Sequence, residues 1–132
     1  MRKVKLSKKN QVRNRMIRNL LSSLVLFEQI QTTPQKAKAL KSKASSFFGK
    51  INKVDSEVSL KRYISSYLYG GSKQKAYDYR SKFESIKTYK VKNRFGDNAE
   101  QMIVKLVFSE EKKAEKTVTE KAKPKKLNKK SK

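Results

Sequence analysis

The sequence of 132 residues predicts an α+β fold, in which helices pack on one face of a small antiparallel sheet. Apolar residues recur at helical spacing as far as residue 83, and alternation typical of strands begins at residue 86. Residues that start or stop helices, such as Pro34 and Gly70, divide the helical part. The predicted order is helix, strand, three helices and two strands, all in one domain over residues 10–108.

The first predicted helix covers residues 8–28. At about 100° per residue, its large apolar side chains, Phe27 included, fall on one arc. Polar and basic side chains, among them Arg18 and Ser22, fall on the opposite arc. We therefore expect the apolar arc to face the core. The β-forming residues of 29–33 predict a short strand after this helix.

The second predicted helix begins with Thr33 as N-cap and Pro34 at the first helical position. Asp55 or Ser56 caps a third helix, and the pair Gly70–Gly71 ends it. Ser72 is expected to cap a fourth helix that runs to Phe83. The core side of the second helix is predicted to consist of Ala37, Leu40, Ala44, Phe47, Phe48, Ile51 and Val54.

Residues 86–92 and 101–108 are predicted to be strands, because apolar residues alternate with polar ones in both. The segment 93–98 between them contains Gly, Asp and Asn, which suit a turn. The two strands should therefore form an antiparallel hairpin. Tyr63, Tyr67 and Tyr89 are spaced for core packing more than for stacking on bases.

The composition excludes several classes of protein. The chain has no Cys and no His, which removes thiolate metal sites, redox chemistry and the commonest general base. Asp and Glu together number 11, and their spacing suggests no convergent carboxylates, so we expect no enzyme, no cofactor and no small-molecule substrate. The longest apolar stretch, residues 20–27, is too short to span a membrane.

The charge predicts a polyanion as partner. Lys and Arg total 35, which gives a formal net charge of +24. Residues 1–27 contain no acid, and they hold four of the seven Arg, whose planar fork pairs with phosphate. Residues 1–9 are interpreted as a basic RNA-binding arm and 109–132 as a disordered Lys-rich tail. The predicted contacts here are Arg2, Lys3, Lys5, Lys8, Lys9, Arg13, Arg15, Arg18 and Asn19.

Further cations are predicted to contact RNA from the rest of the domain. Lys36 and Lys38 open the second helix, whose N-terminal amides favour an anion. Arg94 lies in the predicted turn, close to Lys92. Any one lysine of this second helix is better explained as a solvated surface charge than as a residue that reads a base.

The motifs resemble those of the bacterial large-subunit ribosomal protein L17 family. The resemblance rests first on Arg18-Asn19-Leu20, Leu24, Glu28 and Ile30. It continues with Thr32-Thr33, Lys36-Ala37-Lys38-Ala39-Leu40 and Gly96-Asp97-Asn98-Ala99. It covers about residues 2–108. The Gly-Gly pair with which the family enters its second strand is absent, and the resemblance places Lys87 where the family has an Arg.

The resemblance implies a structural protein bound to large-subunit ribosomal RNA and to neighbouring ribosomal proteins. It implies a cytoplasmic location in the ribosome, on the solvent side near the exit of the peptide tunnel. An architectural DNA-binding protein is the alternative, although the sequence analysis finds no hairpin arm tipped by Pro or a large apolar residue. A cationic membrane-surface protein, based on the amphipathic first helix, is the third interpretation.

Overall fold

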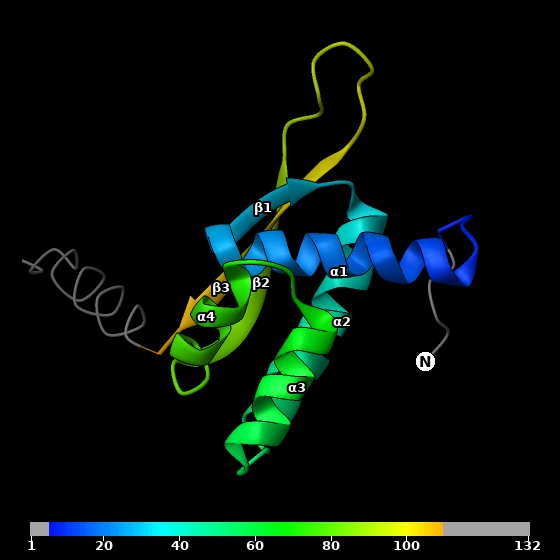
Figure 1. The fold of residues 1–132 in the computed structure, drawn as a ribbon. Helices are drawn as coiled ribbons and strands as arrows, with labels where there is room; N and C mark the ends of the chain where they lie inside the picture. The colour runs from blue at the N-terminus through cyan, green and yellow to red at the C-terminus, as the bar shows by residue number, and fades with distance from the viewer. Residues whose placement is uncertain (1–5, 110–132) are drawn as a thin grey trace, which may run out of the picture.

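The computed structural model describes residues 6–109, which form four helices and one three-stranded sheet (Figure 1). The fold is α+β, as the sequence predicts. Residues 1–5 of the predicted arm and residues 110–132 of the predicted tail lie outside the described part. The elements are α1 (Asn10–Phe27), β1 (Gln29–Thr32), α2 (Pro34–Ile51), α3 (Glu57–Tyr67), α4 (Ser72–Asp78), β2 (Phe83–Val91) and β3 (Gln101–Phe108).

The last strand occupies the centre of the sheet. The strand order is β1-β3-β2, and both pairs are antiparallel. The predicted hairpin of β2 and β3 is confirmed by this pairing. Val104 and Leu106 of β3 are completely buried and face the helices, with Ile30 of β1 opposite Val104 and Ile86 of β2 opposite Leu106.

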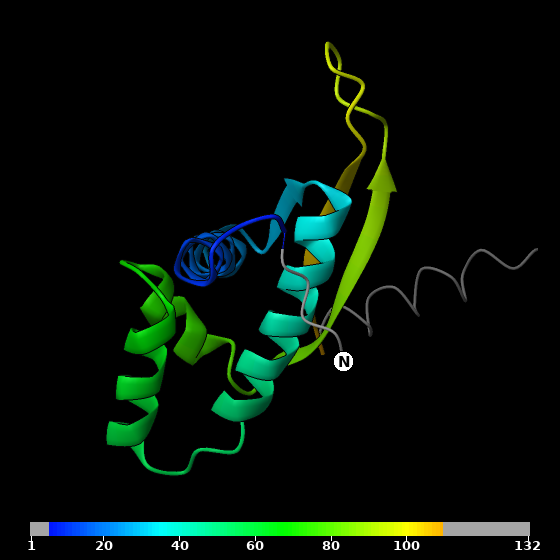
Figure 2. The ribbon, with the colours of Figure 1, turned by 90° about the vertical axis from the view of Figure 1, so that its right-hand side faces the viewer.

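The helices cover one face of this sheet. α2 lies against β2 and β3, and α1 crosses beside α2 at the β1 end (Figures 1 and 2). α3 packs on the opposite side of α2 from the sheet, and α4 packs on α1. The core therefore lies between α1, α2 and the sheet, with α3 and α4 closing it from outside.

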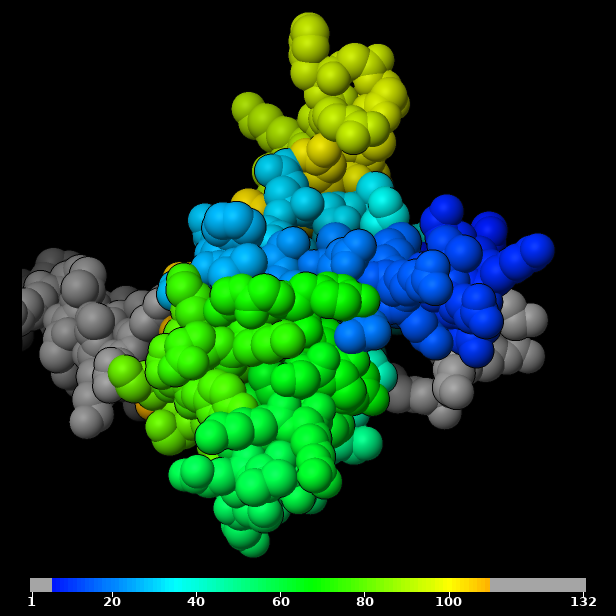
Figure 3. Space-filling model, viewed as in Figure 1, coloured from blue at the N-terminus to red at the C-terminus, as the bar shows by residue number. Residues whose placement is uncertain are grey.

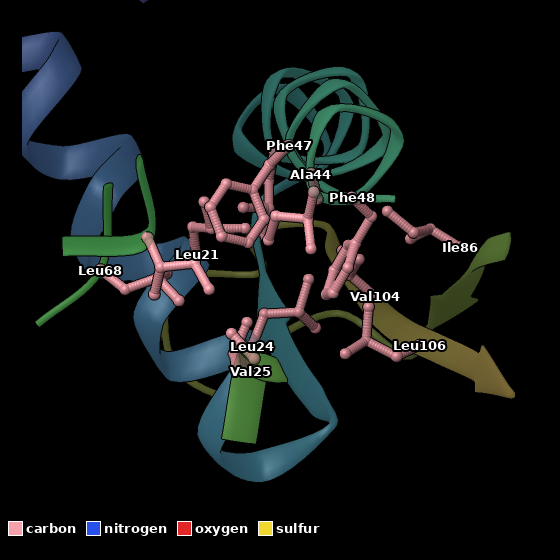
Figure 4. Close-up of a cluster of buried hydrophobic side chains, with 14 of the residues drawn as sticks. Leu21, Leu24, Val25, Ala44, Phe47, Phe48, Leu68, Ile86, Val104 and Leu106 are labelled. Atoms are coloured by element: carbon pink, nitrogen blue, oxygen red, sulfur yellow. The ribbon is translucent and has the colours of Figure 1, made fainter. Parts of the chain in front are cut away.

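Two adjacent aromatic residues of α2 fill the centre of the core (Figure 4). The Phe48 ring is stacked on the Phe83 ring at the start of β2, with ring centroids 4.1 Å apart. The Phe47 ring meets Phe48 edge-on at 5.4 Å and is stacked on Tyr63 of α3 at 5.8 Å. Phe48 thus contacts the sheet, while Phe47 contacts α3.

The corner between α1 and β1 is fastened by hydrogen bonds. Glu28 has a positive φ of 63°, and its backbone carbonyl accepts a bond from the Leu106 amide at 2.8 Å. The Glu28 carboxylate accepts a bond from the Tyr79 hydroxyl at 2.7 Å. The pKa of Tyr79 is raised to about 12, mainly because its hydroxyl is buried and secondly because of this hydrogen bond. The Lys75 ammonium donates to the Leu26 carbonyl at 2.7 Å, which satisfies one of the open carbonyls at the end of α1.

The predicted fourth helix is wrong at both ends. α4 ends at Asp78 and Gly71 takes the N-cap position, whereas Ser72 is fully buried and its hydroxyl donates to the Tyr69 carbonyl. Phe83 belongs to β2, which therefore begins three residues earlier than predicted. The reason is tertiary: the stacking of Phe83 on Phe48 outweighs the local helical spacing.

The buried side of α1 also differs from the prediction. Phe27 is 70% exposed, whereas Ser22 is only 7% exposed and accepts a hydrogen bond from the Tyr69 amide. The cause is the 68–71 loop and α4, which cover the flank of α1 that is predicted to face solvent. The buried residues of α1 are Leu21, Ser22, Leu24 and Val25.

The other helix ends lie close to the predicted positions. Thr33 is the N-cap of α2 with Pro34 at its first position, and Ser56 is the N-cap of α3. α3 ends at Tyr67, before the two glycines, and Gly70 adopts a φ of +55° in the turn toward α4. The glycines therefore allow the turn but do not end the helix.

Replacing Phe48 by Ala should lower the free energy of unfolding by about 3–5 kcal/mol, because the ring is fully buried and leaves a cavity between α2 and β2. Chemical denaturation measures this change. The matched control is Phe27→Ala, which removes the same ring from an exposed position and should change stability by less than about 0.5 kcal/mol. Equal losses in both variants would contradict the assigned core.

Candidate nucleic-acid interface

A group of cations surrounds the start of α1, and we call it the basic end of α1: Lys8 and Lys9 precede the helix, and Arg13 and Arg15 lie in its first two turns. Lys8, Lys9 and Arg15 are exposed, and the Arg13 guanidinium is oriented by a 2.7 Å bond that it donates to the Asn10 side chain. The first turn holds no acid, and no side chain caps it. Cations at a helix N-terminus oppose the helix dipole and cost about 0.3–1 kcal/mol each. The basic end therefore works against the stability of α1 and concentrates positive potential there.

Arg18 has a structural contact that sequence reasoning missed. Its guanidinium lies over the Tyr69 ring, 4.5 Å from the centroid, in a cation–π contact. Its Nε is buried and has no hydrogen-bond partner among the described residues. Arg18 thus helps to hold α1 against the 68–71 loop, whereas the neighbouring Asn19, also predicted to contact RNA, is exposed. A contact of Arg18 with RNA stays a prediction.

A second group of cations lies at the start of α2. Lys36 is half-buried and Lys38 is exposed, and the first turn of α2 contains no acid. Figure 2 looks toward the N-terminal end of α1, with the start of α2 beside it and the β2–β3 hairpin rising above. The basic end of α1 and the start of α2 therefore face the same side of the molecule.

The remaining predicted contacts lie on the sheet. Lys87 follows the buried Ile86 and so points to the face of the sheet that the helices leave uncovered. It lies directly opposite Lys105 in the register of β2 and β3. Lys92 is exposed just beyond β2.

The hairpin tip is held by bonds among its own residues. Arg94 Nε donates to Asp97 Oδ1 at 3.0 Å, and Arg94 Nη2 donates to the other carboxylate oxygen. Arg94 is exposed in the turn, as predicted, and it is paired with Asp97. The hydrogen bonds from Arg94 are the largest cause that lowers the pKa of Asp97 from its ordinary 3.8 to about 2, and the bond from the Ala99 amide is the second. The Asn93 and Asn98 side chains are joined at 3.0 Å.

The hairpin tip also presents a residue that the sequence analysis overlooked. Phe95 is 105% exposed, so the expectation that no large apolar residue tips this arm is wrong. The turn residues around Phe95 were the available signal, because they predict that the segment lies at the surface. Tyr89 is 47% exposed instead of buried, whereas Tyr63 and Tyr67 pack beside the core as predicted.

The described residues thus form a small α+β body with exposed cations on α1, α2 and the hairpin, which is typical of a module that binds a polyanion. The sequence profile of the family described as ribosomal protein L17 matches residues 16–107. The chain belongs to the ribosomal protein L17 family. This family consists of structural proteins of the large ribosomal subunit, not of enzymes. No curated protein matches the chain.

The match begins at Met16, so the whole basic end of α1 lies before the matched region. Among residues 6–109, no helix combines the length and the apolar character that crossing a membrane requires. Nor do His, Cys, Asp or Glu side chains of these residues gather in a group of three that could hold a metal ion.

The Asp97 carboxyl should titrate at about pH 2, and Arg94→Ala should raise its pKa toward the ordinary 3.8 by removing the main hydrogen-bond donor. Because the folded pKa is lowered, the ion pair stabilises the tip above about pH 4, and this contribution is lost as the pH falls through about 2. NMR titration of the side-chain carboxyl measures both values. An Asp97 pKa that is ordinary in the parent protein would contradict the closed tip.

Proposed function

We propose that this chain is a structural constituent of the large ribosomal subunit that binds 23S-type ribosomal RNA through the basic arm and the basic end of α1. One observation carries the proposal: cations cluster around the acid-free start of α1, where they oppose the helix dipole and take no part in the core. A bound polyanion converts this unfavourable arrangement into a favourable one.

Further contacts are proposed for the start of α2, through Lys36 and Lys38, and for the sheet, through Lys87 and Lys92. Recognition of this kind depends on the shape and phosphates of folded RNA. The resemblance to the family supports a position on the solvent side of the large subunit, near the exit of the peptide tunnel, with ribosomal proteins as neighbours. The corresponding location in the cell is the cytoplasm.

An architectural DNA-binding protein is the second candidate. The exposed Phe95 at a hairpin tip supports it, because such proteins insert apolar wedges between base steps. Membership in a family of ribosomal proteins favours RNA. Competition between duplex DNA and ribosomal RNA separates the two candidates.

Reversing two exposed charges tests the RNA contact of α1. The variant Lys9→Glu/Arg15→Glu should bind deproteinised large-subunit RNA at least about tenfold more weakly. The slope of log affinity against log salt concentration should fall by the amount that about two phosphate contacts contribute. The two introduced Glu side chains interact favourably with the helix dipole, so α1 should stay folded. Circular dichroism measures the helix content. Filter binding at several salt concentrations measures the affinity and the slope.

The matched control for this variant is Lys53→Glu/Lys61→Glu, which makes the same change of charge at exposed positions near the far end of α2 and on α3. We expect this control to retain most of the affinity. Equal loss in both variants would show that binding depends only on total charge and would contradict a defined site on α1.

The affinity for RNA should change less than about twofold between about pH 5.5 and 7.5. The chain has no His, and Lys and Arg stay charged over this range because their ordinary pKa values are about 10 or higher. The same binding assay across this range, on an RNA that does not refold, checks the expectation. A steep pH dependence would show that a titrating group takes part in recognition.

A further inference from the structure

Phe95 lies in the turn of the segment 92–100, which joins β2 to β3. This segment projects away from the body (Figures 1 and 3). The side chain is 105% exposed, which is more than any other large apolar residue of the described part. Phe95 contributes nothing to the core, and an aromatic ring in water is unfavourable for the isolated protein. The ring therefore takes no part in the packing of the domain and is available to a partner.

The conformation of the tip keeps the ring in solvent. The Arg94 amide donates to the Ala99 carbonyl at 2.9 Å, and the Ala99 amide donates to Asp97 Oδ1 at 3.2 Å. Gly96 has a φ of +110° and Asn98 a φ of +51°, both in the left-handed region that suits Gly and Asn. Together with the Arg94–Asp97 ion pair, these features close the loop that carries Phe95.

We propose that Phe95 stacks on an unpaired nucleobase of ribosomal RNA, with the hairpin inserted between RNA segments. This inference rests on the proposed function and extends it from phosphate contacts to a base contact. Every nucleobase has a face on which one aromatic ring can stack, so a single exposed Phe is sufficient.

The surroundings of Phe95 favour RNA over a protein partner. Phe95 is the only large apolar residue of the turn 93–98, whereas a protein interface needs a wider apolar core around such a residue. The neighbouring Lys92 is exposed, and no ion pair involves it within residues 6–109. It is therefore available for a phosphate next to the stacked base.

A tryptophan at the tip reports directly on the contact, because the chain contains no Trp. Phe95→Trp is titrated with deproteinised large-subunit RNA while filter binding follows complex formation independently. Stacking on a base should quench the indole fluorescence as the complex forms. The matched control, Phe27→Trp, places the same reporter at an exposed position on α1 and should be quenched much less.

Three substitutions test the energetic role of the ring. Phe95→Ala should weaken RNA binding by about 5- to 100-fold, which is the effect of losing one stacked base. Phe95→Tyr should restore most of the affinity, whereas Phe95→Leu should not, because leucine is apolar but has no ring. Thermal unfolding should be unchanged in all three, since Phe95 contacts no core residue.

The outcomes separate this inference from the proposed function. If the Phe95→Trp variant binds RNA with its indole fluorescence unquenched, and Phe95→Ala binds with normal affinity, the stacking proposal is overturned and the proposed function stays intact. A third result would also overturn the proposal: the indole emission of Phe95→Trp shifts to the blue without quenching, and Phe95→Leu binds RNA as tightly as the parent. This result would place the tip in an apolar pocket. Absence of RNA binding by the parent protein would overturn both.

Discussion

The adjacent rings of Phe47 and Phe48 connect the main parts of this fold. Phe48 stacks on Phe83, which fixes the start of the hairpin on α2, and Phe47 stacks on Tyr63, which fixes α3 on the other side. Both rings are essentially fully buried. This aromatic centre holds α2 against the sheet and so helps to fix the basic end of α1 relative to the hairpin tip.

Three of the few acids of the described residues have local structural roles, and the cations outnumber the acids. Glu28 accepts the Tyr79 hydroxyl at the α1–β1 corner, and Asp97 closes the hairpin tip around Arg94. Glu100 bridges to Lys90 across the hairpin at 3.2 Å. Exposed pairs of this kind contribute little to stability, but they order the surfaces that a polyanion would meet.

The elements could be predicted from the sequence where local patterns and tertiary packing agree. Pro34 starts α2, and alternating apolar residues define β3. The predictions are wrong where a contact between residues far apart in the sequence determines the structure. The stacking on Phe48 places Phe83 in a strand, and the loop that contains Tyr69 buries Ser22. The charge pattern identified exposed cations on α1, but the cation–π contact of Arg18 depends on a residue far along the chain and leaves no local signal.

The central claim is that the chain is a structural part of the large subunit, held there by defined contacts with RNA. Its most direct test is sedimentation of a lysate on a density gradient before and after a high-salt wash. We expect one copy per large subunit, retained through the wash. Release by salt would show that delocalised charge alone accounts for binding, and a peak away from the large subunit would contradict the account.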